Sequence, residues 1–155
     1  MPITKISDLG LPAGSVLQVV QTTSASSLTT TSASFVTLNL AATITPSSAS
    51  SKILMLFTTG GQNTTGSNGC VITIYRGSIA SGTNLGNSTW GFGNFGVNNA
   101  PADSLLTPFS IVHLDSPSTT SAITYTPAGR ANSGTNLVTS FGASRGSFIL
   151  MEIAG

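Results

Sequence analysis

The sequence predicts an all-β protein, a jelly-roll sandwich of about 8–10 antiparallel strands. The first observation is a series of short segments that are β-branched and apolar or alternate apolar with polar residues, separated by turn residues at intervals of roughly 8–12 positions. The second is that no stretch carries the apolar stripe of a useful helix. The third is that long connections rich in Ser, Gly and Asn alternate with short ones, which favours two stacked sheets over a single barrel.

A chain of 155 residues suits one domain with a sizeable core. We expect a short extended N-terminal arm at residues 1–13 and a single jelly-roll domain at residues 14–155. The arm lies between two prolines and has no sustained helical spacing. Its four aliphatic residues predict docking on a partner subunit, and they are Ile3, Ile6, Leu9 and Leu11. A frayed terminus is the simpler alternative.

The first half of the chain predicts five strands, at residues 14–21, 35–40, 42–45, 52–58 and 70–76. The stretch 22–34 is nearly all Ser and Thr, and we expect it to be an exposed loop or an edge segment. Val36, Leu38 and Leu40 fall on one side of the second strand, which predicts one wet face. Pro46 and the serines after it supply the turn between the third and fourth strands.

The second half predicts further extended segments at residues 89–97, 104–114, 122–130, 136–141 and 147–154. The first of these alternates Gly with aromatic residues, the third bears Thr and Tyr, and the last is densely apolar. Turn-forming residues lie between them. Together with the first half, these segments complete the two sheets of the predicted sandwich.

Two of the predicted strands are apolar on both sides, at residues 53–57 and 148–151. A strand with one wet face should alternate, so both faces of these strands need cover. Self-association around a threefold axis is the expected cover, and a loop that roofs the sheet is the alternative. The candidate subunit-interface residues are Leu54, Leu56, Phe148 and Leu150. A register slip of one residue would exchange the two faces.

Charged residues make up 6% of the chain, against roughly 25% in an ordinary soluble domain. The formal net charge is +1 and the basic residues are scattered, so we expect no binding to nucleic acid. No apolar run reaches the length of a signal peptide or a membrane span, so neither secretion nor membrane insertion is expected. A surface that depends on Ser, Thr and Asn suits a protein within an assembly or in the extracellular medium.

The sequence offers little material for catalysis, metal or cofactor binding, and we expect none of the three. Residues 91–96 match Gly-x-Gly-x-x-Gly, but no helix follows to bind a pyrophosphate. Ser110, His113 and Asp115 lie on one predicted strand, where local spacing does not bring three side chains onto one reacting atom. With one His and one Cys, metal clusters lack ligands. Cys70 is expected in the core.

Two smaller expectations concern single side chains. Glu152 lies between Met151 and Ile153, so its carboxylate should be partly buried and paired with Arg130 or Arg145. Three aromatic residues follow one another among glycines, and they are Trp90, Phe92 and Phe95. They are predicted to fill the core or a subunit contact, and a platform that stacks on a sugar ring is the functional alternative.

Several blocks of the sequence, in this order, resemble small virion proteins and fibre-tip domains of tailed bacteriophages, notably those of cyanobacteria and other aquatic bacteria. They are LPAGSVLQVV (11–20), ATITPSSASSKIL (42–54), LDSPSTTSAITY (114–125), NSG (132–134) and LMEI (150–153). The resemblance implies a jelly-roll module displayed on a virion, commonly as a trimer and without catalysis, made in the host cytoplasm. Residues 77–103 match nothing in the family's pattern, so the resemblance assigns no ligand site there.

Only about thirteen residues precede the first predicted strand, whereas a fibre would place a shaft or an attachment domain there. We therefore expect a capsid cement or decoration protein that binds the major capsid protein or other virion proteins on the outer shell. The alternative is a tail-fibre tip or receptor-binding module that contacts host surface glycans.

Overall fold

The computed structural model describes residues 11–63, 69–95, 105–132, 137–139 and 145–155, and within these residues every regular element is a strand. The strands are β1 (Val16–Ser24), β2 (Leu28–Thr30), β3 (Val36–Thr37), β4 (Ala42–Ile44), β5 (Lys52–Asn63), β6 (Cys70–Arg76), β7 (Thr83–Asn84), β8 (Gly93–Phe95), β9 (Leu105–Asp115), β10 (Ile123–Ala131), β11 (Leu137–Thr139) and β12 (Gly146–Ile153). The all-β prediction is confirmed.

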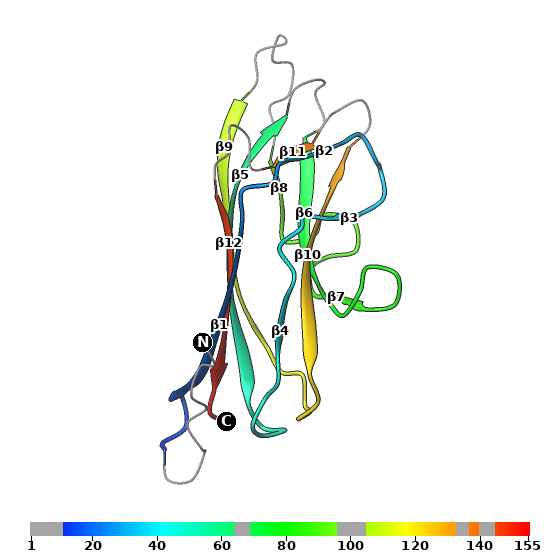
Figure 1. Cartoon of the computed structure of the whole chain (residues 1–155). Helices are drawn as coiled ribbons and strands as arrows, with labels where there is room; N and C mark the ends of the chain where they lie inside the picture. The colour runs from blue at the N-terminus through cyan, green and yellow to red at the C-terminus, as the bar shows by residue number, and fades with distance from the viewer. Residues whose placement is uncertain (1–10, 64–68, 96–104, 133–136, 140–144) are drawn as a thin grey trace.

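These strands form two antiparallel sheets that face each other (Figure 1). The first sheet has the order β1-β12-β5-β9, and β11 and β2 extend it at the upper end of β5. In the second sheet β10 lies between β6 and the short strands β3 and β4, and β7 and β8 pair with the other edge of β6. Strands from the first and second halves of the chain therefore interleave in both sheets, which is the arrangement of a jelly roll.

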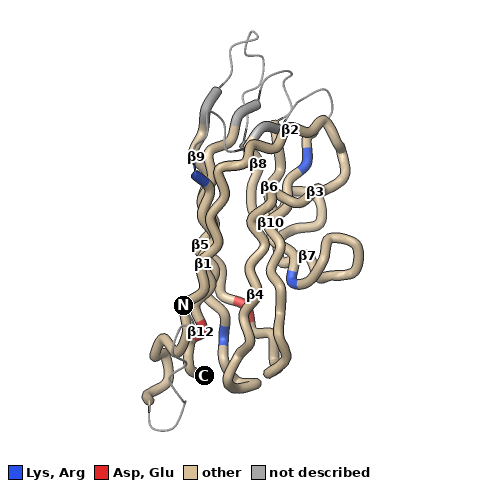
Figure 2. The backbone as a smooth tube through the Cα atoms, in the orientation of Figure 1, with Lys and Arg blue, Asp and Glu red and all other residues tan. Residues whose placement is uncertain are grey.

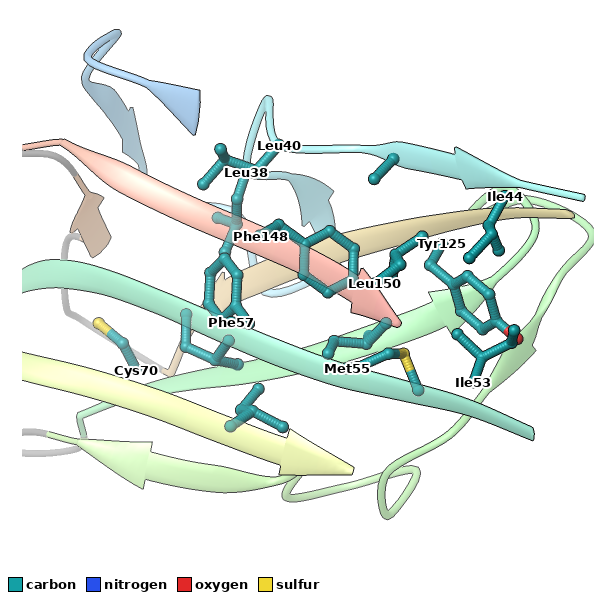
Figure 3. Close-up of a cluster of buried hydrophobic side chains, with 14 residues drawn as sticks. Leu38, Leu40, Ile44, Ile53, Met55, Phe57, Cys70, Tyr125, Phe148 and Leu150 are labelled. Atoms are coloured by element: carbon teal, nitrogen blue, oxygen red, sulfur yellow. The ribbon is translucent and has the colours of Figure 1, made fainter. Parts of the chain in front are cut away.

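The core lies between the sheets and is built by alternation along β5. Ile53, Met55 and Phe57 are fully buried and point toward the second sheet (Figure 3). The ring of Phe57 meets that of Phe148 edge to face, with the centroids 5.9 Å apart. Burial of each such side chain contributes about 1.5–3 kcal/mol. The predicted phase of residues 53–57 is therefore confirmed.

The chain itself covers the outer face of the second sheet. Val71 and Thr73 on this face of β6 are as fully buried as the core residues. Phe35, in the segment before β3, places its ring edge-on against Tyr75, with the centroids 5.9 Å apart. The segment after β6 returns to the same face, where Thr73 donates a hydrogen bond to Asn84. Segments of the chain therefore cover the second sheet. The covering loop that was the alternative for residues 53–57 and 148–151 is thus found on the other sheet.

The described charged residues are few and scattered (Figure 2). They are Lys52, Arg76, Arg130, Arg145, Asp115 and Glu152. Both carboxylates are buried, whereas Lys52 and Arg145 are exposed. Within the described residues no basic stripe forms on either sheet.

Candidate functional site

The outer face of the first sheet is apolar across four strands. Strand pairing places Val19, Met151, Leu54 and Leu114 in one row, and Gln21, Ile149, Leu56 and Val112 in the next. Side chains of directly paired residues share a face of an antiparallel sheet. A third row begins with the paired residues Val16 and Ile153. A β-bulge follows Val16, and the side chain of Leu17 is buried in the interior. We call the nine apolar residues of these rows the apolar face.

Exposure on the apolar face is greatest toward the edges of the sheet. Val112 is 68% exposed, Leu114 47% and Val16 46%. The other six apolar side chains are half-buried by their neighbours in the sheet. β9 pairs only with β5 among the described strands, so Val112 and Leu114 stand on an edge strand. Two adjacent apolar side chains of this strand are therefore open to water.

Polar residues border the apolar face on two sides. Above it, the next row of paired residues carries only hydroxyl groups, from Thr23, Ser147, Thr58 and Ser110. Below it, Lys52 is the outward residue of β5 and pairs with Ile153. Within the described residues no carboxylate lies on this face, because Asp115 and Glu152 both point into the sandwich.

The predicted interface residues divide between the two faces. Leu54 and Leu56 lie on the apolar face, as expected for their phase. Phe148 and Leu150 do not, because their side chains are fully buried in the core. The register pairs them with Phe57 and Met55, which are the inward residues of β5. The outward residues of β12 are instead Ile149, Met151 and Ile153, one position away from the predicted set.

Most of the predicted arm lies outside the described residues, including Ile3, Ile6 and Leu9. Leu11 is described and is 37% exposed. The chain then joins the first sheet through two backbone hydrogen bonds of 2.8 Å, from Gly14 N–H to the Ala154 carbonyl and from Ala154 N–H to the Ser15 carbonyl. The arm therefore leaves the sandwich beside Val16, at the lower end of the apolar face.

Of the three aromatic residues considered as a platform, the side chains of two are described, and they differ in exposure. Phe92 is partly buried and packs against His113, with ring centroids 5.0 Å apart. Trp90 is presented to solvent, with 53% of its surface exposed. Phe95 belongs to β8, and its side chain lies outside the described part.

Trp90 lies at the tip of a tightly bonded loop, residues 87–91. The N–H groups of Asn87 and Gly91 each donate to the other residue's carbonyl, at 2.9 and 2.8 Å. The Asn87 side-chain oxygen accepts from the N–H groups of Thr89 and Trp90. The guanidinium of Arg130 donates to the Thr89 carbonyl at 2.6 Å. These bonds fix the backbone that carries the exposed indole, on the side of the molecule opposite the apolar face.

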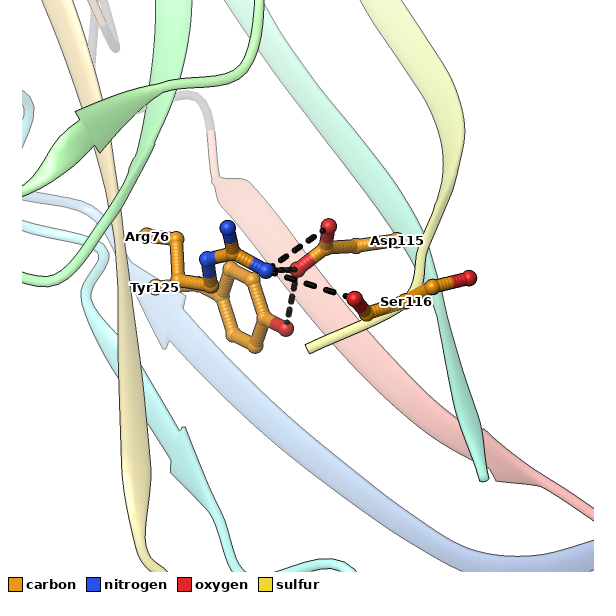
Figure 4. Close-up of polar contacts among 4 residues, drawn as sticks. All are labelled: Arg76, Asp115, Ser116 and Tyr125. Carbon is orange, nitrogen blue, oxygen red and sulfur yellow. Dashed lines mark hydrogen bonds and ion pairs between the residues drawn. The ribbon is translucent and has the colours of Figure 1, made fainter. Parts of the chain in front are cut away.

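The residues considered as a catalytic triad point to different places. Ser110 is on the outward face of β9, whereas His113 and Asp115 point inward. Asp115 Oδ2 accepts a hydrogen bond from the Tyr125 hydroxyl at 2.7 Å, and Arg76 Nη1 lies 3.3 Å from both carboxylate oxygens (Figure 4). Burial, followed by the bond to Asp115, raises the pKa of Tyr125 far above its ordinary value. This group joins the two sheets and is structural.

Glu152 is fully buried, but the predicted pairing with Arg130 or Arg145 is wrong. Its Oε1 accepts from the Ser47 N–H and hydroxyl, both at 2.5 Å, and from the Ser51 hydroxyl at 2.9 Å. Its Oε2 accepts from Gln18 Nε2 at 3.1 Å. Burial opposes ionisation, but the hydrogen bonds outweigh burial and lower the pKa of Glu152 below its ordinary value.

The Gly-x-Gly-x-x-Gly match has a structural explanation. Gly91 has φ +57°, and a Cβ there would overlap the carbonyl oxygen of Ile72. Gly93 begins β8, so a strand stands where dinucleotide binding requires a helix. In the described residues no group of three His, Cys, Asp or Glu side chains lies close enough to hold a metal ion. No helix of membrane-spanning length and hydropathy occurs in the same residues.

No protein-family model matches the sequence, and no curated protein matches it. Among solved structures, the chain is similar to the VP2 subviral particle of infectious bursal disease virus, at 16% identity and a TM-score of 0.43, over 88% of this chain and 37% of that chain. For T=1 particles derived from the same virus the identity is 15% and the TM-score 0.40, over 89% of this chain and 36% of the other. The chain thus spans little more than a third of these proteins. Likenesses of this degree carry no inference about what it binds or does.

Proposed function

We propose that the chain is a non-enzymatic structural protein of a tailed-phage virion, a homotrimeric cement or decoration protein that binds the outer surface of the capsid. The observation that carries this proposal is the apolar face. Its exposed residues Val112, Leu114 and Val16 lie in rows that cross four strands, which is a surface suited to assembly. The low charge of the whole chain, 6% of its residues, supports the same reading.

The resemblance to phage virion proteins supports the proposal through the residues that its blocks bring together. Gln18 from the first block and Ser47 and Ser51 from the second all donate to Glu152 from the last. The block at residues 114–125 supplies the bond between Tyr125 and Asp115. The blocks therefore supply the residues around the two buried carboxylates, which join distant parts of the sandwich. We take the resemblance to concern the fold for this reason.

A structural role also agrees with the state of the polar side chains. Asp115 is engaged by Tyr125 and Arg76, and Glu152 by hydroxyl and amide donors. Ser110 is on the opposite face of β9 from His113. In the described residues, Asp115 and Glu152 thus accept hydrogen bonds from other side chains of the fold. Ser110 and His113 do not converge with them on one substrate position.

The second candidate is a tail-fibre tip or receptor-binding module that contacts host glycans, and Trp90 is the observation that favours it. An exposed indole on a loop whose backbone is already fixed by hydrogen bonds can stack on a sugar ring with little ordering of the loop on binding. Neutral hydrogen-bonding side chains of Asn87, Ser88 and Thr89 flank it. This site would lie away from the apolar face.

The location of the protein in particles tests the proposal. Antibodies raised against the purified chain are applied to intact virions of the phage that encodes it, followed by gold labelling and electron microscopy. Label spread over the capsid is expected. Label confined to the tail would favour the glycan-binding alternative. Intact particles that carry no label, while disrupted particles of the same preparation are labelled, would overturn both proposals.

A further inference from the structure

We infer that the apolar face is covered by a second copy of this chain, in a contact centred on β9 and β5. The inference rests on the proposed role as an assembling virion protein and names the surface through which the copies meet. Three features of the structure carry it: the difference between the two outer faces, the size of the apolar face, and its charge.

The chain covers one outer face of the sandwich and leaves the other exposed within the described residues. On the second sheet, Phe35 and the segment that contains Asn84 cover β6, so that Val71 and Thr73 are fully buried. On the first sheet, Val112 keeps 68% of its surface exposed. Among the described residues no segment of the chain crosses the first sheet to cover it. Within the described residues only the first sheet is left without cover, and we infer that a second copy supplies it.

The size of the apolar face suits the centre of an interface between folded copies. Each of its nine residues occupies about 4.8 by 6.8 Å of the sheet, so together they span roughly 300 Å². A stable interface of standard size buries about 800 Å² on each partner. The apolar face would supply more than a third of this area, and a polar rim supplies the remainder in interfaces of this kind. The hydroxyl row from Thr23 to Ser110 is such a rim.

The charge of the face favours a copy of itself as the occupant. No described carboxylate lies on the face, and its one basic residue, Lys52, is at the lower border and exposed to solvent. Two such faces bring no unpaired charge into the contact, so their association carries no large desolvation cost. Around a threefold axis the face of each copy meets parts of the same face on two neighbours, so the side chains converge on the axis in place of stacking as two parallel sheets. Leu54, Leu56, Val112 and Leu114 have the size to fill the apolar centre of such a contact.

The test compares the mass of the purified chain with that of the double variant Val112→Asp, Leu114→Asp, by light scattering after size exclusion. The wild type is expected to be an oligomer. Two buried charges should raise the dissociation constant at least about 100-fold, so that the variant elutes as a monomer with an unchanged circular dichroism spectrum. Ala80→Asp is the matched control, since Ala80 is exposed in the loop after β6, away from the apolar face. It should keep the wild-type mass.

A second measurement holds even if the charged variant fails to fold. A photoreactive side chain in place of Val112 should cross-link one copy to another, and the same group in place of Ala80 should not. A monomeric wild type, or equal cross-linking from both positions, would overturn the contact. If the wild type is a dimer and the double variant is a monomer, the contact is supported and the threefold symmetry is overturned. A monomer whose antibody still labels the capsid overturns the contact and the proposed homotrimer, but leaves the proposed place on the capsid standing.

Discussion

The hydroxyl of Tyr125 on β10 donates a hydrogen bond of 2.7 Å to Asp115 on β9 and so joins the two sheets inside the sandwich. Arg76 on β6 approaches the same carboxylate at 3.3 Å. The tie lies on the inner side of β9, whose outer side carries Val112 and Leu114. The bond therefore helps to hold the edge strand on which the proposed contact is centred.

Tyr125→Phe should lower the free energy of unfolding by about 1.5–3 kcal/mol, because it removes a hydrogen bond to a buried carboxylate. The measurement is denaturant unfolding followed by circular dichroism. Tyr75→Phe is the matched control, since Tyr75 is half-buried and its hydroxyl has no hydrogen bond within the described residues. Equal stability of the two variants would show that the Tyr125 bond contributes nothing.

The hydrogen bonds to Glu152 predict a loss of stability in acid. Because the folded state lowers the pKa of Glu152 from the ordinary 4.5, its contribution is complete above that pH and is lost as the pH falls through the folded-state pKa. Glu152→Gln should remove this part of the pH dependence. It should also destabilise the protein near neutral pH, since the amide cannot accept all four hydrogen bonds. The midpoint of thermal unfolding, measured from neutral to acid pH, checks both effects. Parallel pH profiles for wild type and variant would contradict this role of Glu152.

Gly91→Ala should destabilise the fold more than Gly14→Ala. Both glycines have positive φ, at +57° and +89°, where a Cβ costs about 1–2 kcal/mol. At Gly91 the Cβ would also overlap the Ile72 carbonyl oxygen, whereas at Gly14 it meets open space. The free energies of unfolding of the two variants give the comparison. If Gly91→Ala were the milder change, the close approach of the loop to β6 would be in error.

Trp90→Ala should change stability by less than about 0.5 kcal/mol, because more than half of the indole is exposed. Capsid binding by this variant should equal that of the wild type. A glycan array checks the alternative function: wild-type binding that disappears in Trp90→Ala would establish Trp90 as a sugar platform and contradict the cement role as the sole function.

The pattern of the sequence predicted the strands best where burial alternates or is continuous. β6 has the predicted bounds, and the outward phase of Leu54 and Leu56 was correct. The predicted strand at 35–40 shortens to Val36–Thr37, because Asn39 takes φ +58° while Leu38 and Leu40 still enter the core. β5 continues to Asn63 through glycines and polar residues, where pairing with β9 and β11 outweighs a turn-like composition.

The candidate site was harder to predict because it depends on strand pairing. Phe148 and Leu150 are as apolar as Ile149 and Met151, so composition could not assign the faces of β12. On β9 the alternation was misleading, because Val112 and Leu114 alternate with His113 and Asp115 and the pattern would place the apolar pair in the core. The partners of Glu152 are Gln18, Ser47 and Ser51, and the nearest of them in sequence, Ser51, is 101 positions away, so only the fold brings them together.

A reconstruction of intact virions by electron cryo-microscopy tests the central claim most directly, because it locates each copy and shows what covers its apolar face. The account predicts sandwiches on the outer capsid surface in groups of three, with Val112 and Leu114 of each copy buried against a neighbouring copy. Copies whose apolar face is open to solvent, or particles whose shell lacks the sandwich, would contradict it.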